Sequence, residues 1–137
     1  MQEIESLQLS LPADKKYLGL LGNVVQEVCH QVPGLSASTG YNVQLAVDEA
    51  VVNVITHAYH DDPTGRIDLV FDICADRLII RVRDWGLGFD PDELPDPDPT
   101  HPEASGYGIY LIRRLMDEVV YQAASDGNCV TMTKMAL

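Results

Sequence analysis

Apolar and polar residues alternate along several short stretches of the chain, and such alternation is the pattern of a half-buried β-strand. Two of these stretches are separated only by Ala75-Asp76, which suits a tight hairpin turn. A second turn is expected at residues 125–128, where Ser, Asp, Gly and Asn follow one another. In all, the alternation predicts five strands, at about residues 3–11, 66–74, 77–84, 119–123 and 129–135.

Three other stretches carry apolar residues at helical spacing. Asp14 is a typical cap before the first of them, and Pro33-Gly34 stops it. Either Ser36 or Ser38 suits the N-cap of the second stretch, which is the longest. The predicted helices cover about residues 17–28, the region from these serines to Tyr59, and residues 106–116.

The composition changes abruptly over residues 89–105, which hold five prolines and six acidic residues. This stretch is too rich in proline for a helix or a central strand, so we expect a loop. The resulting order, β-α-α-β-β-loop-α-β-β, predicts an α/β (α+β) two-layer sandwich, with a mixed, mostly antiparallel sheet and the helices on one face. A chain of 137 residues has room for one such domain, expected over residues 1–137.

The formal net charge of −12 narrows the range of partners. Nucleic acids and anionic membranes attract clustered Lys and Arg, so neither is expected to bind directly. No apolar stretch approaches the roughly 20 residues that span a bilayer, and the first residues lack the basic and then apolar pattern of a secretory signal. Cys29, Cys74 and Cys129 are widely spaced and are expected to be free thiols. The sequence therefore favours a cytoplasmic protein.

Three short segments carry the candidate chemistry: EAVVN at 49–53, DWGLG at 84–88 and GYGI at 106–109. At about 100° per residue, Glu49, Asn53 and His57 fall on one stripe of the second helix, each one turn from the next. A carboxylate at Glu49 can deprotonate a hydroxyl or a water beside a phosphate, and the amide oxygen of Asn53 can ligate Mg²⁺. His57 either touches phosphate or packs near the helix C-terminus, where histidine is common.

The other two segments lie at turns and hold glycines. Asp84 ends a strand, and its carboxylate can accept a hydrogen bond from an exocyclic amine, while Gly86 and Gly88 allow a close backbone approach. Gly106 and Gly108 open a helix whose exposed N–H groups can bind phosphate without a lysine. The chain has neither the GKS or GKT of a Walker A loop nor a GxGxxG after its first strand. A nucleotide pocket of another class is therefore predicted.

With these segments in this order, the chain resembles the GHKL ATPase superfamily, named for gyrase, a heat-shock chaperone, histidine kinases and MutL. The VDEAVVNVITHAY helix and the RDWGLGFD turn look most like the bacterial anti-sigma factor serine/threonine protein kinases. The resemblance covers nearly the whole chain and implies a histidine-kinase-like ATPase domain with a Bergerat-type fold that binds ATP with Mg²⁺. It also implies phosphorylation of a small anti-sigma-factor antagonist protein and sequestration of a sigma factor.

The resemblance implies a role for each residue of the first two segments. Glu49 would be the catalytic base, and Asn53 would be the Mg²⁺ ligand. Asp84 would be the acid that reads adenine, with Gly86 and Gly88 shaping the adenine side of the pocket.

It also implies roles further along the chain. Gly106 and Gly108 would close the phosphate side, and residues 89–105 would form the mobile ATP lid. Thr131 would support adenine from the last strand, although the glycine-threonine pair usual in the family is replaced by Gly127-Asn128.

The expected lid departs from the family in its charge. Lids of this kind tend to carry Arg or Lys just before the glycine pair, whereas residues 89–112 contain neither. Basic groups at a transferring phosphoryl are worth about 10³ to 10⁵ in rate in other phosphotransfer enzymes. A slow kinase and a non-catalytic nucleotide-binding switch therefore stand beside the kinase interpretation, as does a histidine-kinase catalytic domain acting in trans. Apolar residues on the first helix suit either the core or a homodimer face.

Overall fold

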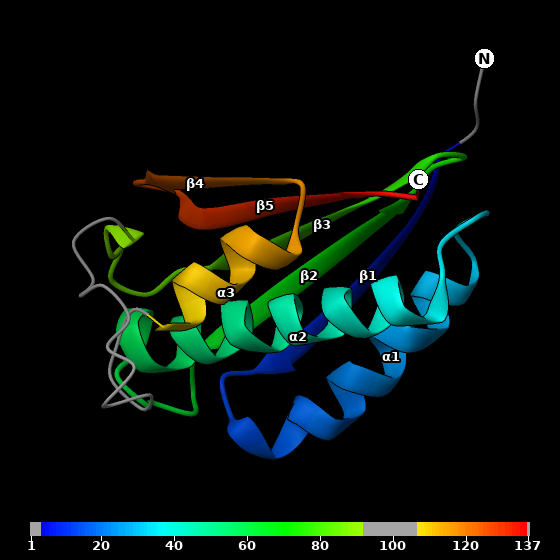
Figure 1. The fold of residues 1–137 in the computed structure, drawn as a ribbon. Coiled ribbons are helices and arrows are strands. Elements are labelled where there is room, and N and C mark those ends of the chain that lie inside the picture. Colours follow the sequence, from blue (N-terminus) through cyan, green and yellow to red (C-terminus); the bar gives the residue numbers. More distant parts are fainter. Residues whose placement is uncertain (1–3, 92–106, 137) are drawn as a thin grey trace.

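The computed structural model describes residues 4–91 and 107–136 of the chain. The elements follow the order that the hydrophobic pattern predicts (Figure 1). They are β1 (Glu5–Pro12), a 3₁₀ turn (Lys15–Tyr17), α1 (Leu18–His30), α2 (Ala37–Asn53), a π-helical turn η2 (Val54–Ala58), β2 (Arg66–Ile73), β3 (Arg77–Asp84), α3 (Tyr107–Leu115), β4 (Glu118–Ala124) and β5 (Gly127–Met135).

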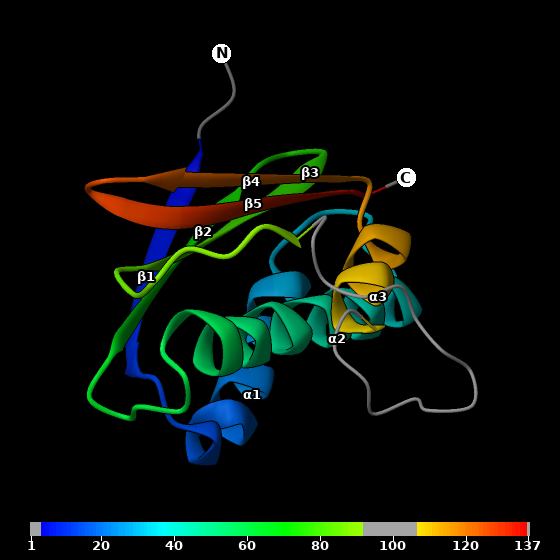
Figure 2. The ribbon, with the colours of Figure 1, turned by 90° about the vertical axis from the view of Figure 1, so that its left-hand side faces the viewer.

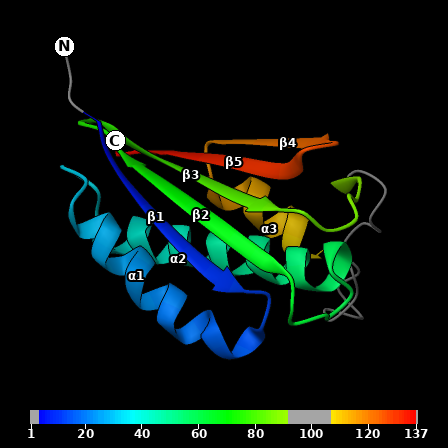
Figure 3. The same ribbon diagram turned by 180° about the vertical axis from the view of Figure 1, so that it is seen from behind.

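The strands form one five-stranded sheet in the order β1-β2-β3-β5-β4. All four pairings are antiparallel. The helices α1, α2 and α3 lie together on one face, which Figure 2 shows as a layer below the sheet. Seen from behind, in Figure 3, the strands lie in front and no described helix covers them. The predicted two-layer sandwich is confirmed.

The core lies between the sheet and the helices because alternate strand residues point toward the helical layer. The inward-facing apolar residues of the central strand β3 and of its neighbour β2 are almost fully buried, and so is the matching stripe of α2. These residues are Ile67, Leu69, Phe71, Leu78, Ile80 and Val82 of the sheet and Val43, Ala46, Val47, Ala50 and Val51 of the helix.

The caps predicted from the sequence are present, but Asp14 caps the 3₁₀ turn that precedes α1 rather than α1 itself. The side chain of Asp14 accepts a hydrogen bond of 3.0 Å from the N–H of Lys16 at the start of the 3₁₀ turn. Ser36, rather than Ser38, caps α2, with its hydroxyl oxygen 3.1 Å from the N–H of Thr39. Capping of this kind satisfies N–H groups that have no partner inside the helix.

The predicted helix to about Tyr59 is confirmed, but its last turn is wider than an α-helix. The N–H of Tyr59 donates to the carbonyl oxygen of Val54 at 3.0 Å, five residues back. His60 and Asp61 then adopt left-handed backbone angles, with φ of 51° and 64°, and the helix ends. A π-turn inside a helix often accompanies a functional site, and this one carries His57.

The cysteines are free thiols, as expected. Burial raises the pKa of Cys29 to about 11, which keeps this thiol protonated and poorly nucleophilic. Within the described ranges, the helices are all too short or too polar to cross a membrane.

Candidate functional site

A cavity of about 470 Å³ lies between α2 and the ends of β3, β4 and β5. Ala50 of α2, Val54 of η2 and Val130 of β5 give it an apolar wall, and Asp84 and Asn128 add polar side chains. Residues 88–91, which follow β3, line it as well. Small-molecule sites usually have about 300–1,000 Å³ and this mixture of apolar walls with a few polar groups.

Asp84 occupies the inner face of β3 at its last residue and is only 3% exposed. Its Oδ1 accepts two hydrogen bonds, one of 2.9 Å from the side-chain amide of Asn128 and one of 3.0 Å from the N–H of Gly86. Burial raises the pKa of Asp84, and these two hydrogen bonds oppose the rise. Because both bonds end on Oδ1, Oδ2 keeps its capacity to accept a hydrogen bond from a ligand.

Asn128 is the site residue that the sequence analysis missed, because Ser-Asp-Gly-Asn was interpreted only as a turn. It pairs directly with Asp84 in the β3–β5 ladder. Its side chain lies on the same inner face of β5 as those of the buried residues Val130 and Met132. One signal in the sequence pointed to Asn128: the glycine-threonine pair usual in the family is absent, and Gly127-Asn128 stands in its place.

Thr131 is not brought to the cavity, which corrects its expected role beside adenine. Successive residues of a strand point to opposite faces, so Thr131 lies on the outer face while Val130 and Met132 point inward. It pairs with Arg81 in β3, three positions from the pairing of Asp84 with Asn128.

Gly86 and Gly88 are glycines for two different steric reasons. A Cβ on Gly86 would clash with the carbonyl oxygen of Ala58, the last residue of η2, and the N–H of Leu87 donates to that same oxygen at 2.9 Å. A Cβ on Gly88 would come within 3.3 Å of Oδ1 of Asn128. The first glycine therefore ties the turn to the helix, and the second leaves room beside the polar end of the cavity.

The structure brings together Glu49, Asn53 and Gly108, three of the predicted site residues. A Cβ on Gly108 would lie 2.6 Å from Oε2 of Glu49 and 3.4 Å from Nδ2 of Asn53, so the start of α3 rests directly on these side chains. Burial raises the pKa of Glu49. Asn53 is 8% exposed, and its Nδ2 is buried without a hydrogen-bond partner among the described residues.

Helix α2 connects this group to the cavity. Ala50 of α2 and Val54 of η2, the turn that continues this helix, line the cavity, and Glu49 and Asn53 are their immediate neighbours in the sequence, on an adjacent stripe. The apolar wall and the polar pair are therefore held in a fixed relation by one rigid element. Gly106 and the lid residues 92–105 lie outside the described part of the chain.

His57 contacts the loop that lines the cavity. Its ring centroid is 5.5 Å from that of Phe89, and the Phe89 ring is in turn 6.3 Å from the ring of Tyr121. Burial lowers the pKa of His57, as does the nearby charge of His60, while Asp61 acts in the opposite direction. This packing matches the second of the two interpretations of His57, in which the ring packs near the end of the helix.

Tyr121 lines the cavity from β4 and was not singled out in the sequence. Its hydroxyl oxygen is buried and has no hydrogen-bond partner among the described residues. Burial raises the pKa of Tyr121 to about 12, and the charge of Arg113 partly opposes this rise. Arg113 belongs to the last turn of α3.

Asp48 was not among the candidate residues identified from the sequence. Burial and, to a smaller extent, the charge of Glu49 raise its pKa to about 6, and its Oδ1 is buried without a partner among the described residues. Five positions separate it from Asn53, which places it about 140° away around the helix, on another side of α2. Among the described residues, 4–91 and 107–136, no group of three or more His, Cys, Asp or Glu side chains is arranged to hold a metal ion.

Comparison with known proteins gives the family of this chain. Residues 11–134 match the histidine kinase-like ATPase domain. The chain belongs to this family. Among curated relatives of this ATPase domain, the serine-protein kinase RsbW of Oceanobacillus iheyensis is 31% identical over 127 residues, which are 87% of this chain and 80% of the relative. The enzyme of the same name from Bacillus velezensis is 32% identical over 139 residues, 96% of this chain and 86% of the relative.

Two solved structures show the same fold as this chain. A Mycobacterium tuberculosis protein with RsbU and RsbW domains superposes with a TM-score of 0.69 at 17% identity, over 96% of this chain. A blue-light activated histidine kinase of Erythrobacter litoralis gives 0.58 at 20% identity, over 90% of this chain. This chain spans 32% and 41% of the length of those two proteins. The likeness to both establishes the two-layer fold.

Proposed function

We propose that this chain is an ATP-dependent serine/threonine protein kinase that phosphorylates a small anti-sigma-factor antagonist and also sequesters a sigma factor. The observation that carries the proposal is the arrangement of Glu49 and Asn53 on the helix that walls a cavity ending in Asp84. This arrangement occurs in a chain similar along 87% and 96% of its length to two serine-protein kinases RsbW.

Adenine fits the end of the cavity that holds Asp84. Oδ2 of Asp84 would accept a hydrogen bond from the exocyclic amine, while Asn128 and the Gly86 N–H keep Oδ1 in place. Ala50 and Val54 would contact the base through apolar surface. A site built to hydrogen-bond a polar group rejects analogues that lack the group, because a buried acceptor is then left unpaired.

The residues beside the start of α3 fit a divalent cation and the phosphates. Mg²⁺ prefers oxygen ligands and commonly takes one or two from the protein and the rest from phosphates and water. Asn53 fits this pattern, because its buried Nδ2 has no hydrogen-bond partner among the described residues, and rotation of the side-chain amide would present its oxygen to the cation. Mg²⁺ would neutralise phosphate charge, while Glu49, Asn53 and the backbone of Gly108 would position the phosphate end of the nucleotide.

Glu49 is the proposed base. Its carboxylate would take the proton of a substrate serine as the serine oxygen attacks the γ-phosphorus, and the bond from this phosphorus to the bridging oxygen of ADP would break. Burial raises the pKa of Glu49, which brings this carboxyl closer to the range in which a general base works well. Residues 89–112 contain no Lys or Arg, so Arg113 in the last turn of α3 is the proposed source of a cation for the phosphates.

Two further parts of the proposal concern partners and location. Leu7 of β1 and Leu20 of α1 are 49% and 50% exposed, which suits a homodimer formed through this side of the molecule. The net charge of −12 disfavours direct nucleic-acid binding, and we propose a cytoplasmic location.

Phosphoryl transfer is tested by incubating the purified protein with labelled ATP, Mg²⁺ and an antagonist protein encoded beside its gene. We expect a labelled serine or threonine on the antagonist, and loss of at least about 100-fold of the rate in Glu49→Gln, with ATP binding preserved. Transfer to histidine would support the histidine-kinase alternative. An inactive protein that binds ATP, and whose Glu49→Gln variant still binds its partner, would support a non-catalytic switch, which the relatives do not favour.

A further inference from the structure

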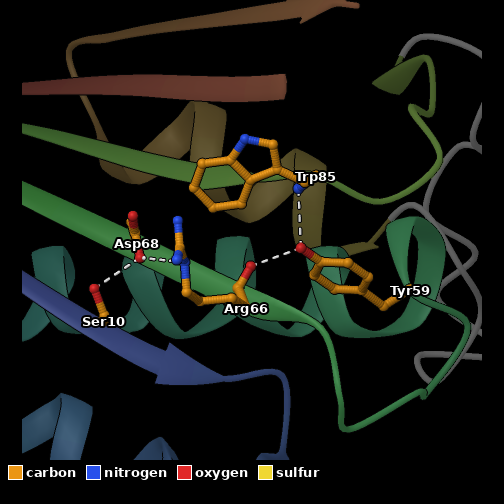
Figure 4. Close-up of polar contacts among 5 residues, drawn as sticks. All are labelled: Ser10, Tyr59, Arg66, Asp68 and Trp85. Carbon is orange, nitrogen blue, oxygen red and sulfur yellow. Dashed lines mark hydrogen bonds and ion pairs between the residues drawn. The ribbon is translucent and has the colours of Figure 1, made fainter. Parts of the chain in front are cut away.

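The sheet face opposite the helices carries an exposed cluster that the proposed kinase chemistry does not use. Trp85 follows β3 directly and is 42% exposed. Cζ of Arg66 lies 4.6 Å from the centroid of its indole ring, and Cζ of Arg83 lies 5.9 Å away. Figure 4 shows the indole ring beside Arg66, on the side of the strands away from the helices. These three residues are called the arginine–tryptophan cluster below.

Trp85 is held in a defined position by its neighbours. The backbone N–H of Trp85 donates a hydrogen bond of 2.9 Å to the hydroxyl of Tyr59, which donates at 2.6 Å to the carbonyl oxygen of Arg66 (Figure 4). Gly127, with a φ of +130°, lies close to the ring, since a Cβ there would come within 3.0 Å of Nε1 of Trp85. A side chain fixed before binding loses little conformational entropy when a partner arrives.

The charge around Trp85 is unusual for an acidic chain with a net charge of −12. Four arginines face outward from β2 and β3, and three of them form ion pairs: Arg66 with Asp68 at 3.2 Å, Arg77 with Asp76 at 3.3 Å, and Arg81 with Asp72. Arg83 forms no ion pair with any described residue. One arginine next to the exposed tryptophan is therefore left without a carboxylate.

The neighbouring strand leaves this arginine accessible. Arg83 lies opposite Cys129 in the β3–β5 ladder, and a cysteine side chain is too short to cover a guanidinium. No described helix lies over this side of the sheet, as Figure 3 shows. Arg83 and Trp85 are exposed together at the end of β3.

We propose that the arginine–tryptophan cluster docks an acidic segment of a partner protein, with a carboxylate on Arg83 and an apolar side chain against Trp85. Tryptophan and arginine are the residues most enriched among those that dominate binding energy at protein interfaces. Complementary charge selects the partner and speeds its association. The phosphates of a nucleic acid would meet the same arginine but would be repelled by the rest of this acidic chain.

This surface is one residue from the proposed nucleotide site. Trp85 stands between Asp84 and Gly86, which are joined by the hydrogen bond from the Gly86 N–H to Oδ1 of Asp84. The docking proposal goes beyond the proposed kinase activity and does not depend on phosphoryl transfer. ATP binding, measured separately, shows which of the two proposals fails if one does.

Trp85 is the single tryptophan of the chain, so its emission reports directly on the cluster. The probe is a synthetic peptide of about twelve residues that alternates glutamate with leucine, and its control replaces each glutamate by lysine. We expect the acidic peptide to give a saturable change in Trp85 emission that weakens at least about fivefold in 300 mM salt, because surface charges are screened. The lysine peptide is expected to give no saturable change.

The decisive variant is Arg83→Glu, compared by calorimetric titration with Arg77→Glu, which changes an arginine at the other end of β3 that pairs with Asp76. We expect Arg83→Glu to weaken peptide binding at least about tenfold and Arg77→Glu to change it less than about twofold. Arg83→Gln, with an intermediate loss, guards against a folding defect in the reversed variant. Absent peptide binding, equal binding by Arg83→Glu, preferred binding of oligo(dT), or occupation of the surface by a second copy of the chain would each overturn the proposal.

Discussion

The side-chain amide of Asn128 donates a hydrogen bond of 2.9 Å to Oδ1 of Asp84, across the ladder that joins β5 to β3. The same amide donates to the carbonyl oxygen of Gly86 at 3.1 Å. One side chain therefore fixes both the carboxylate at the end of the strand and the turn that follows it. The consequences can be measured.

Replacing Asn128 by alanine should weaken binding of a non-hydrolysable ATP analogue by about 5- to 50-fold. The carboxylate of Asp84 loses one of its two hydrogen bonds, and such a charged bond contributes about 1.5–3 kcal/mol. Asn128→Thr, which keeps a donor on the same strand residue, should recover part of the affinity. Calorimetric titration measures both variants, and an unchanged affinity in Asn128→Ala would contradict the role given to Asn128.

Replacing Gly108 by alanine should reduce both stability and transfer activity. The new Cβ would lie 2.6 Å from Oε2 of Glu49, so either α3 or the proposed base must move. Over-packing of this kind costs about 1–3 kcal/mol in the free energy of unfolding. Gly19→Ala in α1 is the matched control, because nothing lies within 4 Å of a Cβ there. That control should be neutral or stabilising by up to about 1 kcal/mol in urea unfolding.

Replacing Tyr121 by phenylalanine should have opposite effects with and without nucleotide. Without it, the variant removes a buried hydroxyl that has no partner among the described residues, so the free energy of unfolding should stay level or rise by up to about 1 kcal/mol. If bound nucleotide supplies the missing partner, the affinity for ATP should fall about 3- to 10-fold. A loss of stability without nucleotide would contradict this account, and chemical denaturation with and without the ATP analogue distinguishes the outcomes.

Replacing Asp48 by asparagine should stabilise the protein more at about pH 7.5 than at about pH 5. The pKa of Asp48 is raised from 3.8 to about 6, so the folded chain binds this proton more tightly than the unfolded chain. The contribution of this group to stability is greatest below pH 3.8 and declines as the pH rises to about 6. Asparagine removes that decline. We expect a rise in melting temperature of about 2–5 °C at the higher pH, with Glu27→Gln, on the exposed surface of α1, as the control.

Much of the fold follows from local patterns in the sequence. The alternation in residues 66–84, the cap at Asp14 and the cap at Ser36 or Ser38 predict elements that the structure contains. The π-turn that ends α2 was not predicted, because its spacing of apolar residues differs little from that of an α-helix. The pairing of β3 with β5 was not predicted either. These two strands are separated in the sequence by α3 and β4, so local patterns do not show that they are neighbours in the sheet.

Part of the candidate site also follows from local sequence patterns, and part depends on the tertiary structure. Glu49 and Asn53 share a helix stripe, and a helix has a fixed period, so the sequence by itself determined their alignment. Asn128 became a partner of Asp84 only through the register of two strands that are 44 residues apart at this pair. The same register turned Thr131 to the outer face. A side-chain period of two makes each of these assignments depend on the exact pairing of distant strands, which only the tertiary structure decided.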